Sequence, residues 1–250
     1  MNRRELLKSL AAIPFAPSLG LASERVAKCA MGLVIHSFWI RSARPLEPRF
    51  PSISDPLSFV ELAAQLGAAG VQTKTGARDP EYLARLRDAV ARHEMYLEGT
   101  INLLKDETDA ARFESEVLAA RSAGATVLRT VCLSGRRYET FERAEQFREF
   151  ADRSWRSLVL AEPIVARHKV RLAVENHKDW RIDEMLGWLK RLSSEYVGVT
   201  LDTGNSIALL EEPHEVVDAL APWTMTTHFK DMAVAEYDDG RIAKHEFTRP

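Results

Sequence analysis

The chain has 250 residues and a mass of 28.2 kDa, with 46% apolar residues, 28% charged residues and a formal net charge of −2. This size suits one large α/β domain or two small ones, and the composition excludes a disordered chain, a coiled coil and a collagen-like fibre. The near-neutral charge argues against a protein that binds nucleic acid or an anionic membrane. The two cysteines, Cys29 and Cys132, cannot build a disulfide framework or a thiolate zinc site, so any metal must be held by carboxylates and histidines.

Residues 1–22 have the features of an export signal. The run Arg3–Lys8 reads Arg-Arg-Glu-Leu-Leu-Lys and resembles a twin-arginine signal, so we expect export to the periplasm. Pro14 and Pro17 interrupt a mildly apolar stretch that is too short to span a bilayer, so we expect no stable membrane insertion. The alternative is an amphipathic helix that packs against the domain, and the protein would then stay in the cytoplasm.

From residue 31 onward, short apolar runs alternate with longer amphipathic segments. The predicted strands are Gly32–Phe38, Gly70–Lys74, Tyr96–Ile101, Thr126–Cys132, Val170–Glu175, Val197–Leu201 and Met225–His228. The predicted helices are Pro56–Leu66, Pro80–His93, Ala110–Ala123, Phe141–Arg167, Ile182–Leu192 and Pro213–Leu220. Asp55 and Asp79 each precede a proline, the pattern of an N-cap followed by proline in the first turn. This alternation indicates a parallel sheet covered by helices.

Two architectures fit such a sheet, a doubly wound open sheet and a (β/α)8 TIM barrel. No G-x-G-x-x-G motif follows any predicted strand, and polar residues fall at the C-terminal ends of many strands, as in a barrel. We therefore expect a TIM barrel over residues 31–250. Since only seven strands are found and the chain ends in a loop-like segment, we expect this barrel to be truncated after the seventh strand. Arg41–Pro56 and Ala233–Phe247 are predicted to be long loops on the substrate-binding face.

The last three predicted strands end in residues that bind metals: Glu175, Asp202 and His228. Because the C-terminal ends of parallel strands meet at one rim, we expect these side chains to converge within a few ångströms. Two carboxylates and one imidazole suit Mn²⁺, Mg²⁺ or Co²⁺, with Zn²⁺ also possible. Each residue alone has an ordinary alternative: a helix N-cap, a turn at residues 202–205, or a hydrogen-bonded structural histidine. Their serial placement favours a metal site.

The motifs around these residues resemble the xylose isomerase-like sugar-phosphate isomerase/epimerase superfamily, from about Met31 to Pro250. The matching segments are Leu97–Gly99, Gly135–Glu139, Glu175–His177, Leu201–Asn205 and His228–Asp231. The resemblance implies a TIM barrel with one divalent metal, most commonly Mn²⁺, held by Glu, Asp, His and a final Glu. Glu175, Asp202 and His228 would be three of these ligands. The fourth normally ends an eighth strand, and we do not assign it to Glu246.

The resemblance further implies a sugar or polyol isomerase or epimerase that works by proton transfer through an enediolate. A metal bound at this site would polarise the substrate carbonyl and acidify the adjacent C–H bond. Glu175 is then the predicted base, and Lys230 and His177 are predicted to stabilise the enediolate or orient hydroxyl groups. For Lys230, the alternative is a salt bridge with Asp231 or with a neighbouring strand end.

Five further residues are predicted to contact substrate: His36, Trp39, Glu98, Arg129 and Asn205. Polar lining of the barrel explains His36, Glu98 and Arg129 about as well, and Asn205 has the alternative of binding a loop backbone. Trp39 could stack on a sugar ring or pack against a helix. An exposed gap between the seventh and first strands would favour association, so a homo-oligomer is possible.

Two other functions remain open, and a third is not favoured. The same enolate chemistry with loss of a β-hydroxyl group would make the protein a keto-polyol (inosose-type) dehydratase or lyase. A missing eighth strand would also fit a non-catalytic carbohydrate-binding relic. The DNA-repair endonuclease branch of the same fold needs many histidine ligands and a basic groove, which seven scattered histidines and a negative net charge do not favour.

Overall fold

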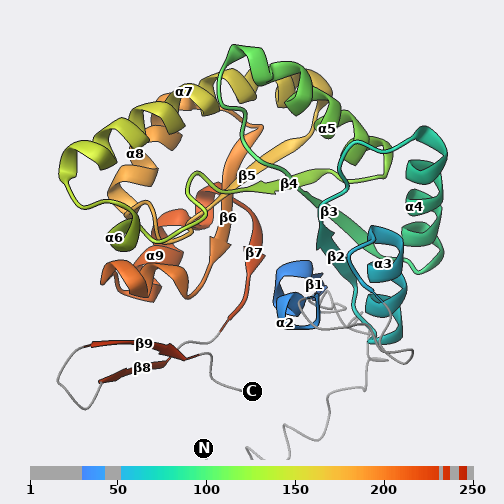
Figure 1. Ribbon diagram of the computed structural model, residues 1–250, viewed down its shortest axis with the longest axis horizontal. Helices are drawn as coiled ribbons and strands as arrows, with labels where there is room; N and C mark the ends of the chain where they lie inside the picture. Colours follow the sequence, from blue (N-terminus) through green and yellow to red (C-terminus); the bar gives the residue numbers. More distant parts are fainter. Residues whose placement is uncertain (1–29, 43–51, 231–232, 237–241, 247–250) are drawn as a thin grey trace, which may run out of the picture. The chain divides into compact units, whose positions relative to one another are not determined.

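The computed structural model describes residues 30–42, 52–230, 233–236 and 242–246. Seven parallel strands form one sheet, and they follow one another in chain order (Figure 1). They are β1 (Leu33–Val34), β2 (Gly70–Thr73), β3 (Tyr96–Thr100), β4 (Val127–Thr130), β5 (Arg171–Glu175), β6 (Val197–Asp202) and β7 (Thr224–His228). The predicted signal at residues 1–22 and most of the predicted loop Arg41–Pro56 lie outside the described residues.

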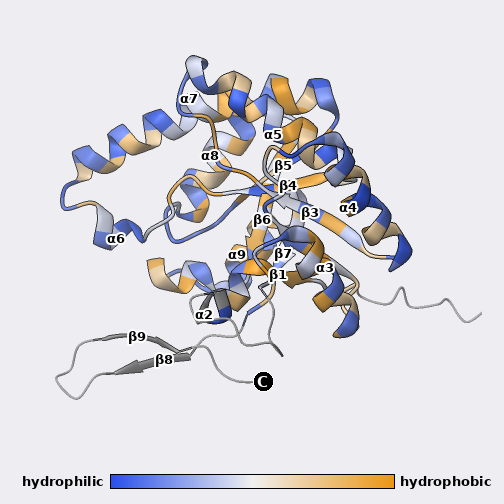
Figure 2. Cartoon of the chain, turned by 45° about the vertical axis from the view of Figure 1, so that its right-hand side comes forward, coloured by the Kyte–Doolittle hydropathy of each residue, from blue (hydrophilic) through white to orange (hydrophobic). Residues whose placement is uncertain are grey.

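Helices connect consecutive strands and lie on the outer side of the curved sheet (Figure 1). The α-helices are α2 (Trp39–Ser42), α3 (Pro56–Gln65), α4 (Pro80–Arg92), α5 (Ala110–Ser122), α6 (Arg137–Thr140), α7 (Ala144–His168), α8 (Ile182–Leu192) and α9 (Pro213–Leu220). Short 3₁₀ segments are η2 (Ile35–Phe38), η3 (Glu107–Asp109), η4 (Asn205–Leu209) and η5 (Ala221–Trp223). Hydrophobic residues gather where these helices meet the sheet (Figure 2).

The predicted helix starts are confirmed by their caps. The Asp55 carboxylate accepts hydrogen bonds from the backbone N–H groups of Leu57 and Ser58 at 3.1 and 3.3 Å, and α3 begins at the next residue, Pro56. Asp79 caps α4 in the same way. The buried residues of α3 recur at the spacing of one helical face and pack on the sheet, which is why this segment forms an amphipathic helix.

The strand register decides which side chains face the barrel interior. Residues paired across parallel strands point to the same face, and alternate residues along a strand share it. Gln72 pairs with Glu98, Glu175 pairs with Thr200, and Asp202 pairs with His228, so these polar side chains share the inner face. The sheet curls until His228 on β7 contacts Gln72 on β2, at 2.9 Å between Nε2 and Oε1. This is the curvature of a TIM barrel, as expected.

Two predictions of local structure were wrong. The first strand, expected over Gly32–Phe38, contains only Leu33 and Val34. Within the described part of the chain, β1 is at the end of the sheet and pairs only with β2, and the chain then turns into η2. The segment Ala233–Phe247 was expected to be a loop, but β8 (Ala233–Glu236) and β9 (Ile242–Glu246) pair as antiparallel strands. Asp239-Gly240, between two alternating runs, is the sequence signal for such a hairpin.

Candidate metal centre

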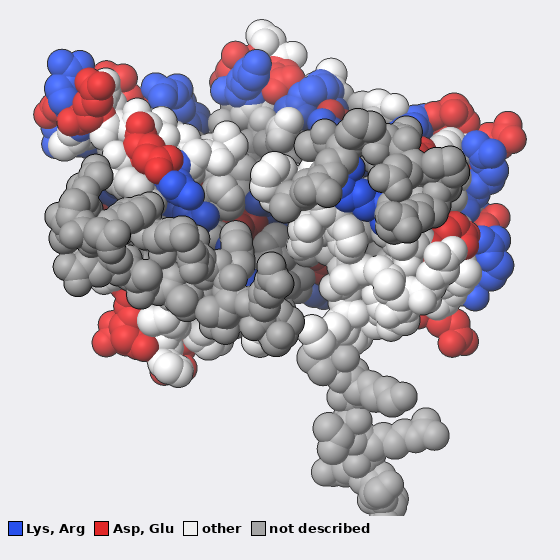
Figure 3. All heavy atoms as spheres, turned by 60° about the horizontal axis from the view of Figure 1, so that its bottom comes forward, with Lys and Arg blue, Asp and Glu red and all other residues white. Residues whose placement is uncertain are grey.

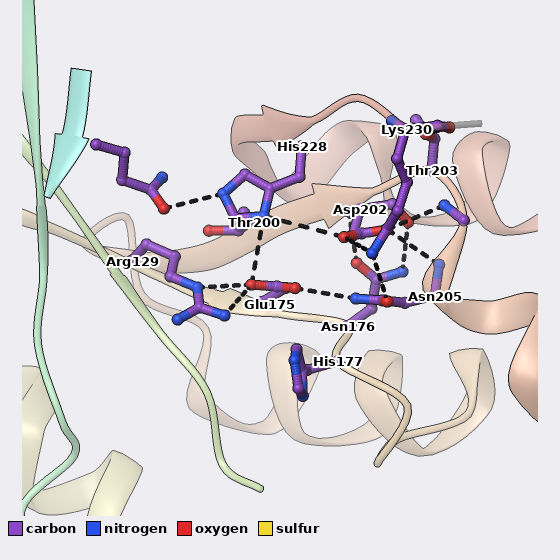
Figure 4. A network of polar contacts seen from close by, with 12 residues as sticks. Arg129, Glu175, Asn176, His177, Thr200, Asp202, Thr203, Asn205, His228 and Lys230 are labelled. Atoms are coloured by element: carbon purple, nitrogen blue, oxygen red, sulfur yellow. Dashed lines mark hydrogen bonds and ion pairs between the residues drawn. The ribbon is translucent and has the colours of Figure 1, made fainter. Parts of the chain in front are cut away.

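Glu175, Asp202 and His228 converge at the C-terminal rim of the sheet (Figure 4). They end β5, β6 and β7, and one possible ligand atom from each lies within 4.8 Å of the other two. Both carboxylates are 2% exposed. The predicted convergence is therefore confirmed.

The two carboxylate oxygens of Asp202 have different partners. Oδ1 accepts hydrogen bonds from the backbone N–H groups of Gly204 and Asn205, both at 3.0 Å, which is the turn that the sequence allowed. Oδ2 faces the Nδ1 atom of His228 at 3.9 Å and the Lys230 ammonium at 2.7 Å. The turn thus orients the carboxylate and leaves Oδ2 directed at the centre.

The side-chain amide of Asn176, which is not among the predicted site residues, joins β5 to β6. Its Oδ1 accepts from the Asp202 N–H at 2.7 Å, and its Nδ2 donates to the Asp202 carbonyl at 3.0 Å. Nδ2 also donates to Ser206 at 3.2 Å. Because Asn176 follows Glu175 directly, this pairing sets the spacing of the two carboxylates. In the sequence, its signal is an Asn that directly follows a strand-end Glu.

Arg129 and Asn205 occupy both oxygens of Glu175. Arg129 donates from Nε to Oε2 at 2.6 Å and forms an ion pair with the same oxygen through Nη2, and Asn205 Nδ2 donates to Oε1 at 2.9 Å. Burial alone would raise the pKa of Glu175, but the nearby His228 and the charge of Arg129 outweigh this and hold it well below its usual range. Glu175 is therefore an anion with little tendency to take up a proton.

Lys230 lies beside Asp202 at the end of the neighbouring strand. A salt bridge with a neighbouring strand end was one of the alternatives for Lys230. Its Nζ is 2.7 Å from Asp202 Oδ2 and donates to Asn205 Oδ1 at 2.7 Å. Asn205 therefore contacts Glu175, Asp202 and Lys230 at once. Its side-chain amide bonds to Glu175 and Lys230, and its backbone N–H bonds to Asp202, so Asn205 orders the site from within.

A second cation, Lys178, lies in the loop after β5. Burial, and then the charges of Lys230 and Arg136, lower its pKa, and the opposing effects of Asp202 and Glu175 are smaller. The rim beside the carboxylates is thus rich in positive charge.

His228 presents its two ring nitrogens to opposite sides. Nδ1 lies 3.4 Å from Glu175 Oε2, and Nε2 lies 2.9 Å from Gln72 Oε1. Gln72 in turn donates from Nε2 to Glu98 Oε2 at 2.8 Å. Glu98, predicted to bind substrate, thus reaches the centre through Gln72. Gln72 was not among the predicted site residues. Its signal in the sequence is a single amide side chain within an apolar strand.

His177 projects from the loop after β5, and its Nδ1 donates to the Leu133 carbonyl at 3.0 Å. Since a carbonyl can only accept, the neutral ring carries its proton on Nδ1 and has a lone pair on Nε2. Burial lowers the pKa of His177, the charge of Glu175 opposes this, and the charge of Arg129 lowers the pKa further. Among the described residues, Nε2 has no hydrogen-bond partner, so it is available to a substrate.

Asp179 fixes the loop that holds His177. Its carboxylate accepts from the backbone N–H groups of His177, Trp180 and Leu133 at 3.2, 2.9 and 3.1 Å, which links the loops after β4 and β5. Burial raises the pKa of Asp179 to about 7, against the opposing effect of these N–H groups.

The structure places His36 and Trp39 on the η2 and α2 segments after β1, and within the described chain neither bonds directly to the three converging residues. His36 is exposed, although partial desolvation and the charge of Arg129 lower its pKa while Glu175 opposes them. Trp39 is 68% exposed, so the packed position that was its alternative is not seen.

The donor set fits a divalent metal ion. Two buried carboxylates and an imidazole nitrogen from adjacent strands match the oxygen-rich sites of Mn²⁺ and Mg²⁺ and also allow Co²⁺ or Zn²⁺. The outer surface carries intermingled Lys, Arg, Asp and Glu on the face drawn in Figure 3, without a continuous patch of one sign among its described residues. None of the described helices is both long and apolar enough to cross a membrane.

Comparison with known proteins matches residues 60–248 to a family model described as "Xylose isomerase-like TIM barrel". A 3-oxo-isoapionate decarboxylase from Pectobacterium atrosepticum is 26% identical over 214 residues, which are 84% of this chain and 71% of that protein. A probable 3-DHS dehydratase from Bacillus anthracis has a TM-score of 0.60 at 17% identity, covering 84% of this chain and 74% of that one. D-psicose 3-epimerase from Clostridium cellulolyticum H10 has a TM-score of 0.61 at 12% identity, covering 79% and 72%.

Proposed function

Because the chain belongs to the xylose isomerase-like TIM-barrel family, we propose that it is a metal-dependent sugar-converting enzyme whose centre is Glu175, Asp202 and His228. The observation behind this proposal is the convergence of three metal-ligand atoms within 4.8 Å at the end of the barrel where such enzymes bind substrate. A bound divalent ion, most simply Mn²⁺, would polarise a substrate carbonyl and stabilise the enolate that follows.

The chain's own residues prepare the site for a carbonyl substrate with oxygen-rich neighbours. Nη1 of Arg129 has no hydrogen-bond partner among the described residues, so it can donate to a substrate oxygen. Lys230 has an ammonium group at the same rim. Cationic donors in a partly buried site stabilise charge that develops on oxygen during the reaction.

The reaction that we favour is decarboxylation of a 3-oxo sugar acid. The carbon–carbon bond to the carboxylate breaks, its electron pair passes toward the oxo group, CO₂ leaves, and the resulting enolate takes up a proton. This reaction needs no base to start it. Glu175 is a poor base, because its oxygens are engaged and its pKa is lowered, so decarboxylation agrees with its state. The similarity to 3-oxo-isoapionate decarboxylase over 84% of the chain supports the same reaction class.

His177 favours a second candidate, isomerisation or epimerisation by proton transfer. Its Nε2 lone pair is available among the described residues, and the Leu133 carbonyl holds the tautomer required of a base. In this case His177 removes a proton beside the carbonyl, and return of the proton to another carbon or face gives the product. In decarboxylation, the same nitrogen relays a solvent proton to the enolate.

Incubation of the Mn²⁺-loaded protein with 3-oxo sugar acids and with ketoses in D₂O separates these reactions. Decarboxylation releases one CO₂ and places one deuterium in the product, whereas proton transfer exchanges deuterium without CO₂. Asp202→Asn should abolish the activity, whichever of the two reactions it is. It should also abolish Mn²⁺ binding, measured by calorimetry. Asp88→Asn, on the exposed face of α4, is the matched control and should change neither. Unchanged Mn²⁺ affinity in Asp202→Asn would refute the metal site.

A further inference from the structure

Gln72 on β2 spans the barrel interior to reach His228 on β7, 156 residues away in the sequence. We propose that Gln72 and Glu98 are positioning residues that keep a proton on Nε2 of His228 and so reserve Nδ1 for the metal. This inference rests on the proposed function in one respect, namely that Nδ1 binds a metal ion. The direction of the hydrogen-bond chain follows from the residues themselves.

The chain of hydrogen bonds has one consistent direction. The Glu98 carboxylate only accepts, so the group of Gln72 that lies 2.8 Å from Glu98 Oε2 is the amide NH₂. The carbonyl oxygen of Gln72 is then the atom at 2.9 Å from His228 Nε2. A carbonyl oxygen needs a donor, so Nε2 carries a proton.

The reversed amide would be unfavourable at both ends. It would place the Gln72 oxygen against the Glu98 carboxylate, so that two acceptors face each other, and it would turn the NH₂ group toward His228. Since the Gln72 side chain is 3% exposed, water cannot compensate for the lost hydrogen bond.

The opposite edge of the ring faces the metal centre. Nδ1 lies 3.4 Å from Glu175 Oε2 and 3.9 Å from Asp202 Oδ2, which is where a shared ion would be held. A ligand histidine whose far nitrogen donates to a fixed acceptor has a defined tautomer and ring orientation. Loss of such a partner typically weakens metal binding by roughly 10–100-fold.

The first test measures Mn²⁺ affinity by calorimetry in a set of variants. Gln72→Met should weaken binding by roughly 10–100-fold. Gln72→Glu should also weaken it, because two carboxylates then face each other. Glu98→Gln should bind like the wild type, because the new amide oxygen still accepts from Gln72. Gln65→Met, at an exposed position of α3, is the matched control and should have no effect.

The double variant Gln72→Glu/Glu98→Gln is decisive. The new carboxylate accepts from His228 Nε2 and from the new amide, so Mn²⁺ binding should return to the wild-type level or become tighter. A role in packing alone predicts that the double variant is at least as impaired as Gln72→Glu. That result, or unchanged affinity in Gln72→Met, would overturn the inference.

A second test reads the tautomer without any reaction. Nitrogen-15 spectra of histidine-labelled protein, at alkaline pH without metal and again with diamagnetic Zn²⁺, should show the His228 proton on Nε2 in both states. A His228→Asn variant assigns the signals. A proton on Nδ1 in the metal-free protein would refute the inference, whereas absence of metal binding in the wild type would refute the proposed function and leave the tautomer result standing.

Discussion

Lys230 and Asp202 form a contact that a metal ion would have to share. The ammonium lies 2.7 Å from Oδ2, the oxygen directed at His228, and the Lys230 side chain is 20% exposed. A cation on a ligand oxygen lowers the affinity of that oxygen for a second cation. Lys230 therefore has opposing effects, because it weakens metal binding and offers a donor to the substrate.

Removing the ammonium should separate these effects. We expect Lys230→Met to tighten Mn²⁺ binding by about fivefold, the equivalent of about 1 kcal/mol for a partly solvated ion pair, and to lower turnover of the loaded enzyme. Calorimetry gives the first quantity and a steady-state assay the second. Lys190→Met, at an exposed position on α8, is the control. Weaker Mn²⁺ binding in Lys230→Met would show that the two cations do not compete.

Asp179 should make stability depend on pH. Its pKa in the folded protein is about 7, above the ordinary carboxyl value near 4, so between these pH values the folded state binds more protons than the unfolded state. The free energy of unfolding should therefore fall as pH rises from about 4 to about 7, by up to about 4 kcal/mol, and level off above. Urea unfolding of wild type and Asp179→Asn across this range isolates the effect. Parallel curves for the two proteins would contradict it.

At the scale of the elements, β6 lies close to the end of η5 and the start of β7 at Gly198, which has no side chain. A Cβ added at this position would lie 2.5 Å from the backbone oxygen of Trp223 and 2.9 Å from Cε of Met225. The register of the two strands also shifts between Val199 and Thr200, just before the residues that lead to Asp202. The close approach therefore lies on the strand pair that carries Asp202 and His228.

A methyl group at this position should test that approach. Gly198→Ala should destabilise the fold by roughly 1–3 kcal/mol, since a backbone oxygen cannot move aside as a side chain can. Gly187→Ala is the control, because nothing lies within 4 Å of its Cβ and alanine favours helix α8 by up to about 1 kcal/mol. Thermal unfolding compares the two. Equal stability of Gly198→Ala and wild type would show that the strands have room to separate.

The elements themselves were largely predictable, and the exceptions have a common cause. The capped helices at Asp55 and Asp79 follow from local signals, as do the buried strands. The length of the first strand was overestimated, because a strand at the end of a sheet pairs on one side only. The β8–β9 pair was missed because the regular alternation of strand and helix outweighed a hairpin signal.

At the scale of the whole molecule, the site joins strands that are distant in the chain. Glu175, Asp202 and His228 come from three strands, and Gln72 adds a fourth on the other side of the barrel. A ligand that binds only when these strands are assembled stabilises the folded state over the unfolded state.

Metal binding should therefore raise the unfolding temperature. At an Mn²⁺ concentration about 100 times Kd, the gain is about 2.7 kcal/mol, which corresponds to several degrees for a chain of this size. Scanning calorimetry in Mn²⁺ and in EDTA measures the shift, and Asp202→Asn should show none. An identical unfolding temperature in Mn²⁺ and EDTA for the wild type would argue against a metal held by all three strands. Export through the N-terminal segment and a homo-oligomer remain predictions, open to a reporter fusion and to light scattering.

The amino-acid sequence by itself determined the parallel strand–helix order and the placement of Glu175, Asp202 and His228 at strand ends. Both depend on local periodicity and on the rule that parallel strands share one rim. Only the tertiary structure decided what those side chains contact: Arg129 and Asn205 on Glu175, Lys230 on Asp202, and Gln72 on His228. These partners depend on the curvature of the sheet and on the register of its strands. Packing over the whole core sets both, and no local pattern in the chain specifies that packing.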